Sequence, residues 1–168
     1  PFCTIEPNLG VVTVPDNRID VLTKLVKPEK TIPTTINFVD IAGLVKGASK
    51  GEGLGNKFLS NLREVDLLIH VVRCFENDNI VHVNGKIDPI SDKEIIDYEL
   101  IIKDLDTVVK RIDKISKQAV TGDKEKKIEY DILSLCKTHL EDGKSLRSLD
   151  LEANQIKWIK NLNLITLK

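Results

Sequence analysis

Short runs of β-branched residues alternate with turn residues over the first part of the chain. Residues 10–14 (Gly-Val-Val-Thr-Val) predict a strand that ends at a Pro-Asp-Asn turn cluster. A short helix is predicted over 18–26, closed by Pro28, and a second strand over 33–41. Because only a short connection separates the two strands, we expect them to pair as an antiparallel ribbon at a sheet edge.

The middle of the chain combines a helical pattern with a nearly continuous apolar run. Apolar residues on one face predict a helix over 54–65. Residues 67–75 (Leu-Leu-Ile-His-Val-Val-Arg-Cys-Phe) predict a strand covered on both faces, as in a parallel α/β sheet. The polar loop that follows, 76–79, would then lie at the sheet edge where such folds place their ligands.

From residue 91 onward the apolar positions follow a heptad spacing. Ser91 and Glu94 form a capping box at the predicted helix start, and the pattern breaks at 121–123 before it resumes as far as Gly143. The predicted seam consists of Ile101, Leu105, Val108, Ile112, Ile115 and Ala119, then Ile128, Ile132, Leu135 and His139. This pattern predicts an antiparallel helical hairpin that projects from an α/β core.

The last residues are predicted to return to that core. A helix is expected near 151–161 and a strand over 162–167.

Composition narrows the class of protein. The 168 residues are 41% hydrophobic with a net charge of −1, which argues against a protein dominated by attraction to a phosphate backbone. No apolar run approaches the roughly 20 residues of a membrane span, and three scattered cysteines indicate reduced thiols, so we expect a cytoplasmic protein. Because the chain begins at Pro1 and lacks methionine, we expect it to be an internal segment of a longer protein.

Candidate chemistry begins where the second predicted strand ends. Asp40 follows the apolar strand and Gly43 comes three residues later, an arrangement that suits a γ-phosphate sensor: the carboxylate faces magnesium and the glycine N–H faces the phosphate. Leu44 stands where many GTPases have a glutamine that orients the attacking water, and leucine cannot hold water by hydrogen bonds. Five of the nine glycines lie between 43 and 55, which suits a switch loop but equally an ordinary surface loop.

Thr4 and the sequence 143–145 are further candidates for a metal site and a phosphate site, respectively. Thr4 precedes the first strand and can ligate magnesium as a switch residue, although it also fits an ordinary loop threonine. Gly143-Lys144-Ser145 matches the end of a phosphate-binding P-loop, but position 138 is Thr138 instead of the required glycine, so we interpret it as a false match. No other segment fits a P-loop.

The three histidines and the basic residues have different interpretations. His70 lies inside the apolar run and is predicted to be a core residue or to support a site, and His139 is predicted to be structural. His82 lies in a loop and can orient or deprotonate water near neutral pH, or be structural. Basic residues near the hairpin tip indicate a solvated face or contact with an acidic partner such as RNA.

Three blocks of the chain are long enough to compare with known families. They are Pro-Phe-Cys-Thr-Ile-Glu-Pro-Asn (1–8), the glycine-rich stretch 38–59, and His-Val-Val-Arg-Cys-Phe-Glu-Asn-Asp (70–78). Together they resemble the YchF/Obg-like ATPase family, P-loop NTPases of the translation-factor class. The resemblance runs over essentially the whole chain.

The resemblance implies an α/β P-loop NTPase core (a G domain) with an inserted antiparallel coiled-coil hairpin. Residues 1–90 would form the core with switches I and II, 91–143 the hairpin insertion, and 144–168 a truncated return to the core. The first strand and the P-loop would precede this chain, and the base-reading motif and a TGS domain would follow it. The segment alone would therefore be inactive.

The family's functional positions carry over onto five residues. Thr4 in switch I and Asp40 would hold Mg²⁺, with Asp40 and Gly43 contacting the nucleotide. Leu44 corresponds to the hydrophobic replacement of glutamine, and His82 would position the attacking water. The implied activity is slow hydrolysis of ATP, or of GTP, with the ribosome as partner and proteasome or stress-response proteins as further candidates. The alternative is a non-catalytic ribosome- or protein-binding module that uses the hairpin.

Overall fold

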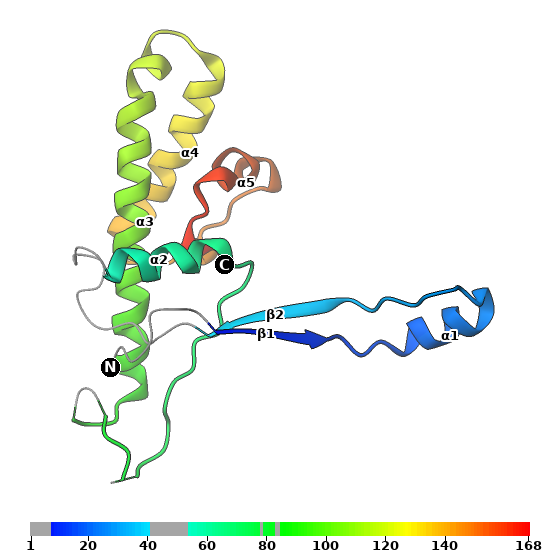
Figure 1. The fold of residues 1–168 in the computed structure, drawn as a ribbon. Helices are drawn as coiled ribbons and strands as arrows, with labels where there is room; N and C mark the ends of the chain where they lie inside the picture. The colour runs from blue at the N-terminus through cyan, green and yellow to red at the C-terminus, as the bar shows by residue number, and fades with distance from the viewer. Residues whose placement is uncertain (1–7, 41–53, 78, 83–84) are drawn as a thin grey trace. The chain divides into compact units, whose positions relative to one another are not determined.

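The computed structural model describes residues 8–40, 54–77, 79–82 and 85–168 (Figure 1). The chain divides into two compact units, here called the N-terminal unit (Pro1–Gly43) and the C-terminal unit (Leu44–Lys168).

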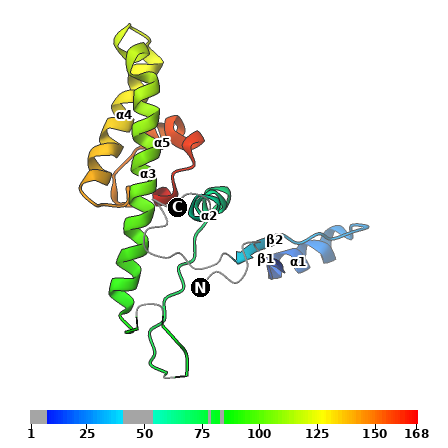
Figure 2. The ribbon, with the colours of Figure 1, turned by 60° about the vertical axis from the view of Figure 1, so that its left-hand side comes forward.

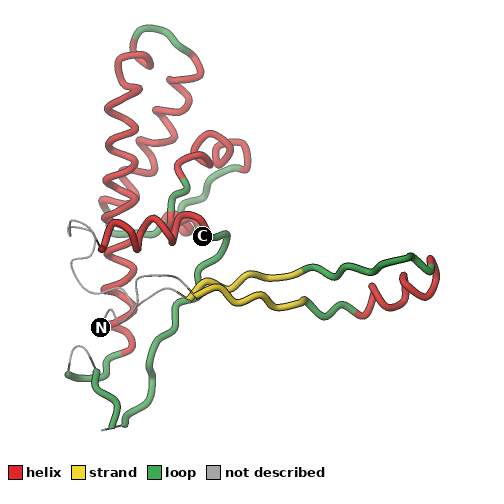
Figure 3. Tube along the Cα trace, viewed as in Figure 1, coloured by secondary structure: helices red, strands yellow, loops and turns green. Residues whose placement is uncertain are grey.

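The N-terminal unit is an antiparallel ribbon with a helix between its strands. Strand β1 (Asn8–Thr13) pairs with β2 (Thr35–Asp40) in a register that runs from Asn8 opposite Asp40 to Thr13 opposite Thr35. The two strands are yellow in Figure 3. Helix α1 (Asn17–Val26) starts after Asp16, whose carboxylate accepts the Arg18 N–H at 2.9 Å. The predicted ribbon and helix are confirmed.

Both faces of the β1–β2 ribbon are open to solvent. Exposed apolar side chains include Leu9, Val11, Val12, Ile36 and Phe38. Helix α1 buries none of its residues either. Backbone hydrogen bonds therefore hold the described part of this unit together, an arrangement that is marginally stable for two strands in isolation.

The C-terminal unit is helical. Its elements are α2 (Leu54–Glu64), α3 (Pro89–Val120), α4 (Lys124–Glu141), the 3-10 helix η1 (Leu146–Ser148), α5 (Ala153–Ile159), and the 3-10 helices η2 (Lys160–Leu162) and η3 (Ile165–Leu167). Figures 1 and 2 show α3 and α4 side by side as a hairpin, with α5 beside α4. The core of this unit lies between α3, α4 and the segments that follow α4.

The ends of the hairpin helices are set by aspartates and glycines. Asp88 caps α3 by accepting the Ser91 N–H at 3.1 Å, so the predicted capping box at Ser91 is wrong. The helix starts earlier because Pro89, which lacks an N–H, suits the first helical position. The turn of the hairpin contains Gly122 with φ +102°, and Asp123 then caps α4.

The buried face of α3 agrees with the predicted seam, but that of α4 differs. Leu133 and Cys136 are fully buried, whereas Ile128 and Leu135 are 46% and 53% exposed. The reason is that α4 packs against α3 on one side and against η1 and α5 on another, so its buried face turns toward all three. The heptad pattern assumes that α4 packs against a single helix, so it does not predict a face buried by three elements.

Two predicted strands are not observed. Residues 67–75 form no strand, and Leu67, Ile69 and Val71 are exposed; His70, predicted in the core, is exposed as well. A strand needs a neighbouring strand for its backbone hydrogen bonds, but the strands of the described residues, β1 and β2, pair with each other in the N-terminal unit.

The second segment predicted as a strand, residues 162–167, forms 3-10 turns instead. Its backbone is bound by a buried carboxylate: Asp104 of α3 accepts the N–H of Ile165 at 3.0 Å, and the N–H and hydroxyl of Thr166 at 2.7 and 2.8 Å. Burial raises the pKa of Asp104 above its ordinary value, although these hydrogen bonds favour the charged form. A side chain from a helix thus takes the place of a neighbouring strand.

Helix α2 is fixed to the rest of the unit at its C-terminal end. The Lys168 ammonium donates to the carbonyls of Leu62 at 3.1 Å, Arg63 at 2.7 Å and Val65. The Arg63 guanidinium donates to the Thr107 hydroxyl of α3. The ammonium group satisfies carbonyls that a helix end leaves without internal partners.

Candidate functional site

Asp40 is the described part of the predicted phosphate sensor. It is the last residue of β2, opposite Asn8 in the ribbon, and its side chain is exposed. Thr4, Gly43 and Leu44 lie outside the described residues. An exposed carboxylate at a strand end is a hard oxygen donor, and Mg²⁺ in nucleotide sites takes one or two such ligands together with phosphate and water oxygens. Asp40 therefore fits a magnesium ligand.

His82 is held against the first turn of α3. Its Nε2 lies 3.1 Å from Oδ2 of Asp92, and the two side chains are only 18% and 20% exposed. The His82 carbonyl accepts the Gly85 N–H at 3.1 Å, and Gly85 has φ +70°, a conformation that favours glycine. The loop thus brings together an imidazole and a carboxylate ten positions apart in the sequence.

Arg73 organises the loop that leads to His82. Its guanidinium donates to the carbonyls of Phe75 at 3.0 Å, Asn77 at 3.0 Å and Ile80 at 2.9 Å, and it lies 5.0 Å from the centre of the Phe75 ring. Three carbonyls on one rigid guanidinium fix the path of the backbone. In the sequence, this role was marked only by the presence of one arginine, Arg73, in the otherwise apolar run 67–75.

Within the C-terminal unit, the structure brings His82 together with Asp92. Asp40 belongs to the N-terminal unit and His82 to the C-terminal unit. Sequence reasoning missed both Asp92 and Arg73. Nothing in the local pattern of Asp92 distinguishes it from a surface charge, and the one signal for Arg73 was its place in an apolar run. Residues 143–145 connect α4 to η1, and the Ser145 hydroxyl donates to the Thr166 carbonyl at 2.9 Å. This position between two helices agrees with the interpretation as a false P-loop match, because a P-loop follows a strand.

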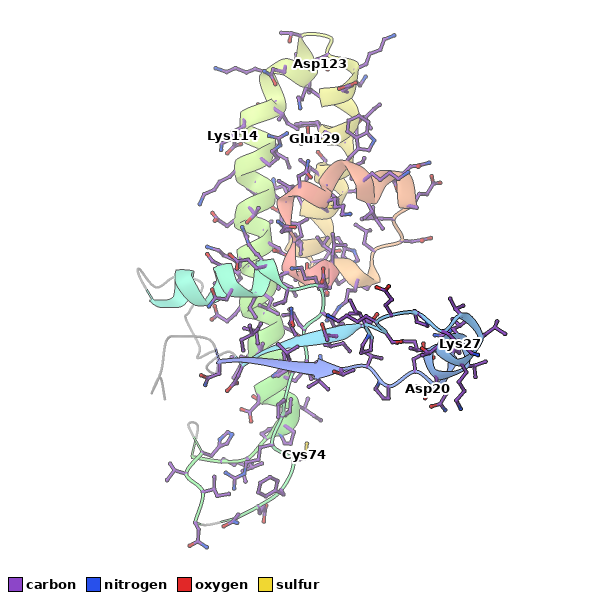
Figure 4. All side chains as sticks on the ribbon, turned by 45° about the vertical axis from the view of Figure 1, so that its right-hand side comes forward. Asp20, Lys27, Cys74, Lys114, Asp123 and Glu129 are labelled. Carbon is purple, nitrogen blue, oxygen red and sulfur yellow. The ribbon has the colours of Figure 1, made fainter. Side chains whose placement is uncertain are left out.

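The charged faces of the hairpin are partly neutralised by pairs within it. The carboxylate of Glu129, on α4 (Figure 4), lies 2.6 Å from Arg111 of α3 and 3.1 Å from Lys126. On α3, Lys110 pairs with Asp106. Burial by itself would raise the pKa of the Glu129 carboxyl. The hydrogen bonds and positive charges of Arg111 and Lys126 have the larger combined effect, so the pKa is lowered.

Neither a metal-binding cluster nor a membrane-spanning helix occurs among the described residues. Those residues contain no group of three or more histidines, cysteines or acidic residues placed to bind a metal ion. None of the helices within these ranges is both long enough and apolar enough to cross a membrane.

Comparison with known proteins identifies the fold class of the chain. It has a P-loop GTPase-like fold, with helices and a small antiparallel sheet. Residues 1–128 match the model of the 50S ribosome-binding GTPase family. The chain belongs to this family, and the predicted resemblance to YchF is confirmed.

Individual relatives carry the YchF name. The chain is 56% identical over 168 residues to the "Ribosome-binding ATPase YchF" of Escherichia coli O157:H7, and 56% identical to that of Bacillus subtilis. The solved structure of the Schizosaccharomyces pombe YchF GTPase matches with a TM-score of 0.75 and 40% identity, covering all of this chain and 46% of that one. The chain likewise spans 46% of the length of the two bacterial relatives.

Proposed function

We propose that the protein containing this chain is a nucleotide-dependent switch protein that hydrolyses ATP, with GTP as the second candidate, and binds the ribosome. The observation that carries the proposal is the 56% identity over all 168 residues to proteins named ribosome-binding ATPase. Because the chain spans about half of these relatives, the activity belongs to the whole protein and not to this segment alone.

The residues of this chain have distinct parts in the proposed reaction. Thr4 and Asp40 would hold Mg²⁺, which supplies positive charge to the phosphate oxygens during phosphoryl transfer. The Gly43 N–H would donate to the γ-phosphate, and Leu44 would line the space that glutamine occupies in other GTPases. His82 would then orient the attacking water, since an imidazole can accept a hydrogen bond at neutral pH.

The test of this mechanism is ATP and GTP turnover by the full-length protein. We expect His82→Ala to lower kcat by about 100-fold, within the range of a lost general base or water-positioning group. Val81→Ala is the matched control, because Val81 is the preceding residue and its side chain is exposed. Unchanged turnover in His82→Ala would remove His82 from the mechanism.

The alternative function is a binding module in which the hairpin docks on the ribosome. The observation in its favour is that the tip of the hairpin, around Asp123, carries basic residues for which an acidic partner is suitable (Figure 4). Reversing the charge of Lys114, Lys117, Lys124 and Lys127 in the full-length protein should abolish co-sedimentation with ribosomes while leaving basal turnover unchanged. Retained co-sedimentation would contradict the module.

A further inference from the structure

We propose that Asp92 is a positioning residue for His82, and that the two form a carboxylate–imidazole pair in the hydrolytic reaction. The inference rests on the proposed role of His82 and names a partner that this role requires. General bases in enzymes are commonly oriented by a third group, most often a carboxylate that accepts the other ring N–H.

The two side chains lie within hydrogen-bonding distance of each other. Asp92 Oδ2 lies 3.1 Å from His82 Nε2, and about four fifths of each side chain is shielded from solvent. Exposed ion pairs hold their side chains weakly, whereas a shielded pair is less screened and restricts both side chains more strongly.

Asp92 is attached to a rigid support. It lies in the first turn of α3, a 32-residue helix, and its N–H donates to the carbonyl of Asp88 at 2.9 Å. The residues of this helix also line the core of the C-terminal unit. A carboxylate on such a helix defines a fixed point for the imidazole, which otherwise depends on a loop.

The backbone around His82 is held independently of Asp92. Arg73 binds the Ile80 carbonyl two residues before His82, and the His82 carbonyl accepts the Gly85 N–H at 3.1 Å. The loop therefore presents the His82 side chain to α3 without requiring the carboxylate for its path. Replacing Asp92 is expected to change the orientation of the ring more than the position of the backbone.

The pair has a defined chemical consequence. When the carboxylate accepts the Nε2–H, the neutral imidazole takes the tautomer in which Nδ1 carries the lone pair. Nδ1 is then the atom that accepts a hydrogen bond from the attacking water, and the carboxylate stabilises the ring as it gains positive charge. An amide at position 92 keeps the size of the side chain but loses the charge.

The test is a double-mutant cycle in the full-length protein, with ATP turnover as the measurement. We expect Asp92→Asn to lower kcat by about tenfold at nearly constant KM, as for other residues that orient a catalytic group. In a His82→Ala background the same substitution should have no further effect. Asp97→Asn, which removes a carboxylate paired with Lys93 on the same helix, should leave kcat unchanged.

The outcomes separate this inference from the proposed function. If His82→Ala is impaired and Asp92→Asn is not, or if Asp92→Asn is equally harmful without His82, the inference is wrong and the proposed function stands. If His82→Ala turns over normally, the inference and the proposed role of His82 are both wrong, and the hydrolytic function stands without them. If neither the wild type nor the variants hydrolyse ATP or GTP, the proposed function itself is wrong.

A second measurement covers the case in which Asp92→Asn folds poorly. Nitrogen-15 NMR of the histidine side chains in the wild-type protein should show His82 as the Nε2–H tautomer. The Nδ1–H tautomer would overturn the inference.

Discussion

Cys136 shows that the interior of the C-terminal unit is much less polar than water. It is fully buried on α4, and burial raises the pKa of its thiol to about 11. Cys74, in contrast, is exposed in the loop before His82 (Figure 4). The two thiols therefore provide a buried reporter and an exposed reporter in the same unit.

The raised pKa of Cys136 predicts a specific alkaline loss of stability. The thiol ionises near 9 when unfolded and near 11 when folded, so the native state holds the proton more tightly and stability falls as pH rises from 9 to 11. The loss attributable to Cys136 should reach about 2 kcal/mol. It is measured as the difference in unfolding free energy between the wild type and Cys136→Ala across this range.

A difference that does not change with pH would contradict the burial of this thiol. Reaction with a thiol reagent at pH 8 gives an independent check, since Cys74 should react rapidly and Cys136 only on unfolding.

Candidate site residues were predictable from sequence only when their chemistry was marked by a motif. Asp40 follows a strand and precedes a glycine cluster, and this order identified it. Asp92 and Arg73 have no such context, because their partners are determined by the path of the loop between them. His70 was misplaced because the strand that would have buried it is not formed.

The helices were predicted well and the later strands were not, for a physical reason. A helix satisfies its backbone hydrogen bonds locally, so capping residues and periodicity locate it. A strand depends on neighbours that its own sequence does not specify. The ribbon of β1 and β2 was predictable because its partner is nearby in the chain, whereas Ile165 and Thr166 bind the carboxylate of Asp104 instead.

The buried face of α4 can be tested with two leucines. Leu133 is fully buried and Leu135, two positions later, is 53% exposed. Leu133→Ala should lower the free energy of unfolding by about 2–5 kcal/mol because it leaves a cavity, whereas Leu135→Ala should cost less than about 1 kcal/mol. Chemical denaturation of the two variants measures both values, and equal losses would support the originally predicted seam.

The two units of the chain hold different parts of the proposed site. Asp40 ends the ribbon of the N-terminal unit, and His82 lies on the helical unit with its own partner Asp92. The division into a core over 1–90 and 144–168 with a hairpin over 91–143 stays a prediction, as does the insertion of the hairpin into a G domain. The proposed reaction requires Mg²⁺ held by Asp40 in the full-length protein.

Magnesium dependence tests that requirement in the full-length protein. With a fluorescent ATP analogue, Mg²⁺ should tighten binding to the wild type by about tenfold relative to EDTA, and Asp40→Asn should remove most of this gain because it loses a charged ligand. Asp20→Asn is the control, since Asp20 is an exposed carboxylate of the same unit, on α1 (Figure 4). An undiminished magnesium effect in Asp40→Asn would exclude Asp40 as a ligand.

Local sequence alone was sufficient to identify the family, the ribbon, the helices and the position of Asp40, because motifs, caps and short connections act over a few residues. Local sequence did not predict the contacts between residues far apart in the chain. These contacts depend on which segments pack together, and they include the pairing of His82 with Asp92, the binding of 165–166 by Asp104 and the buried face of α4. Such contacts are selected by the free energy of the whole folded unit, in which burial and hydrogen bonding across long separations outweigh local preference.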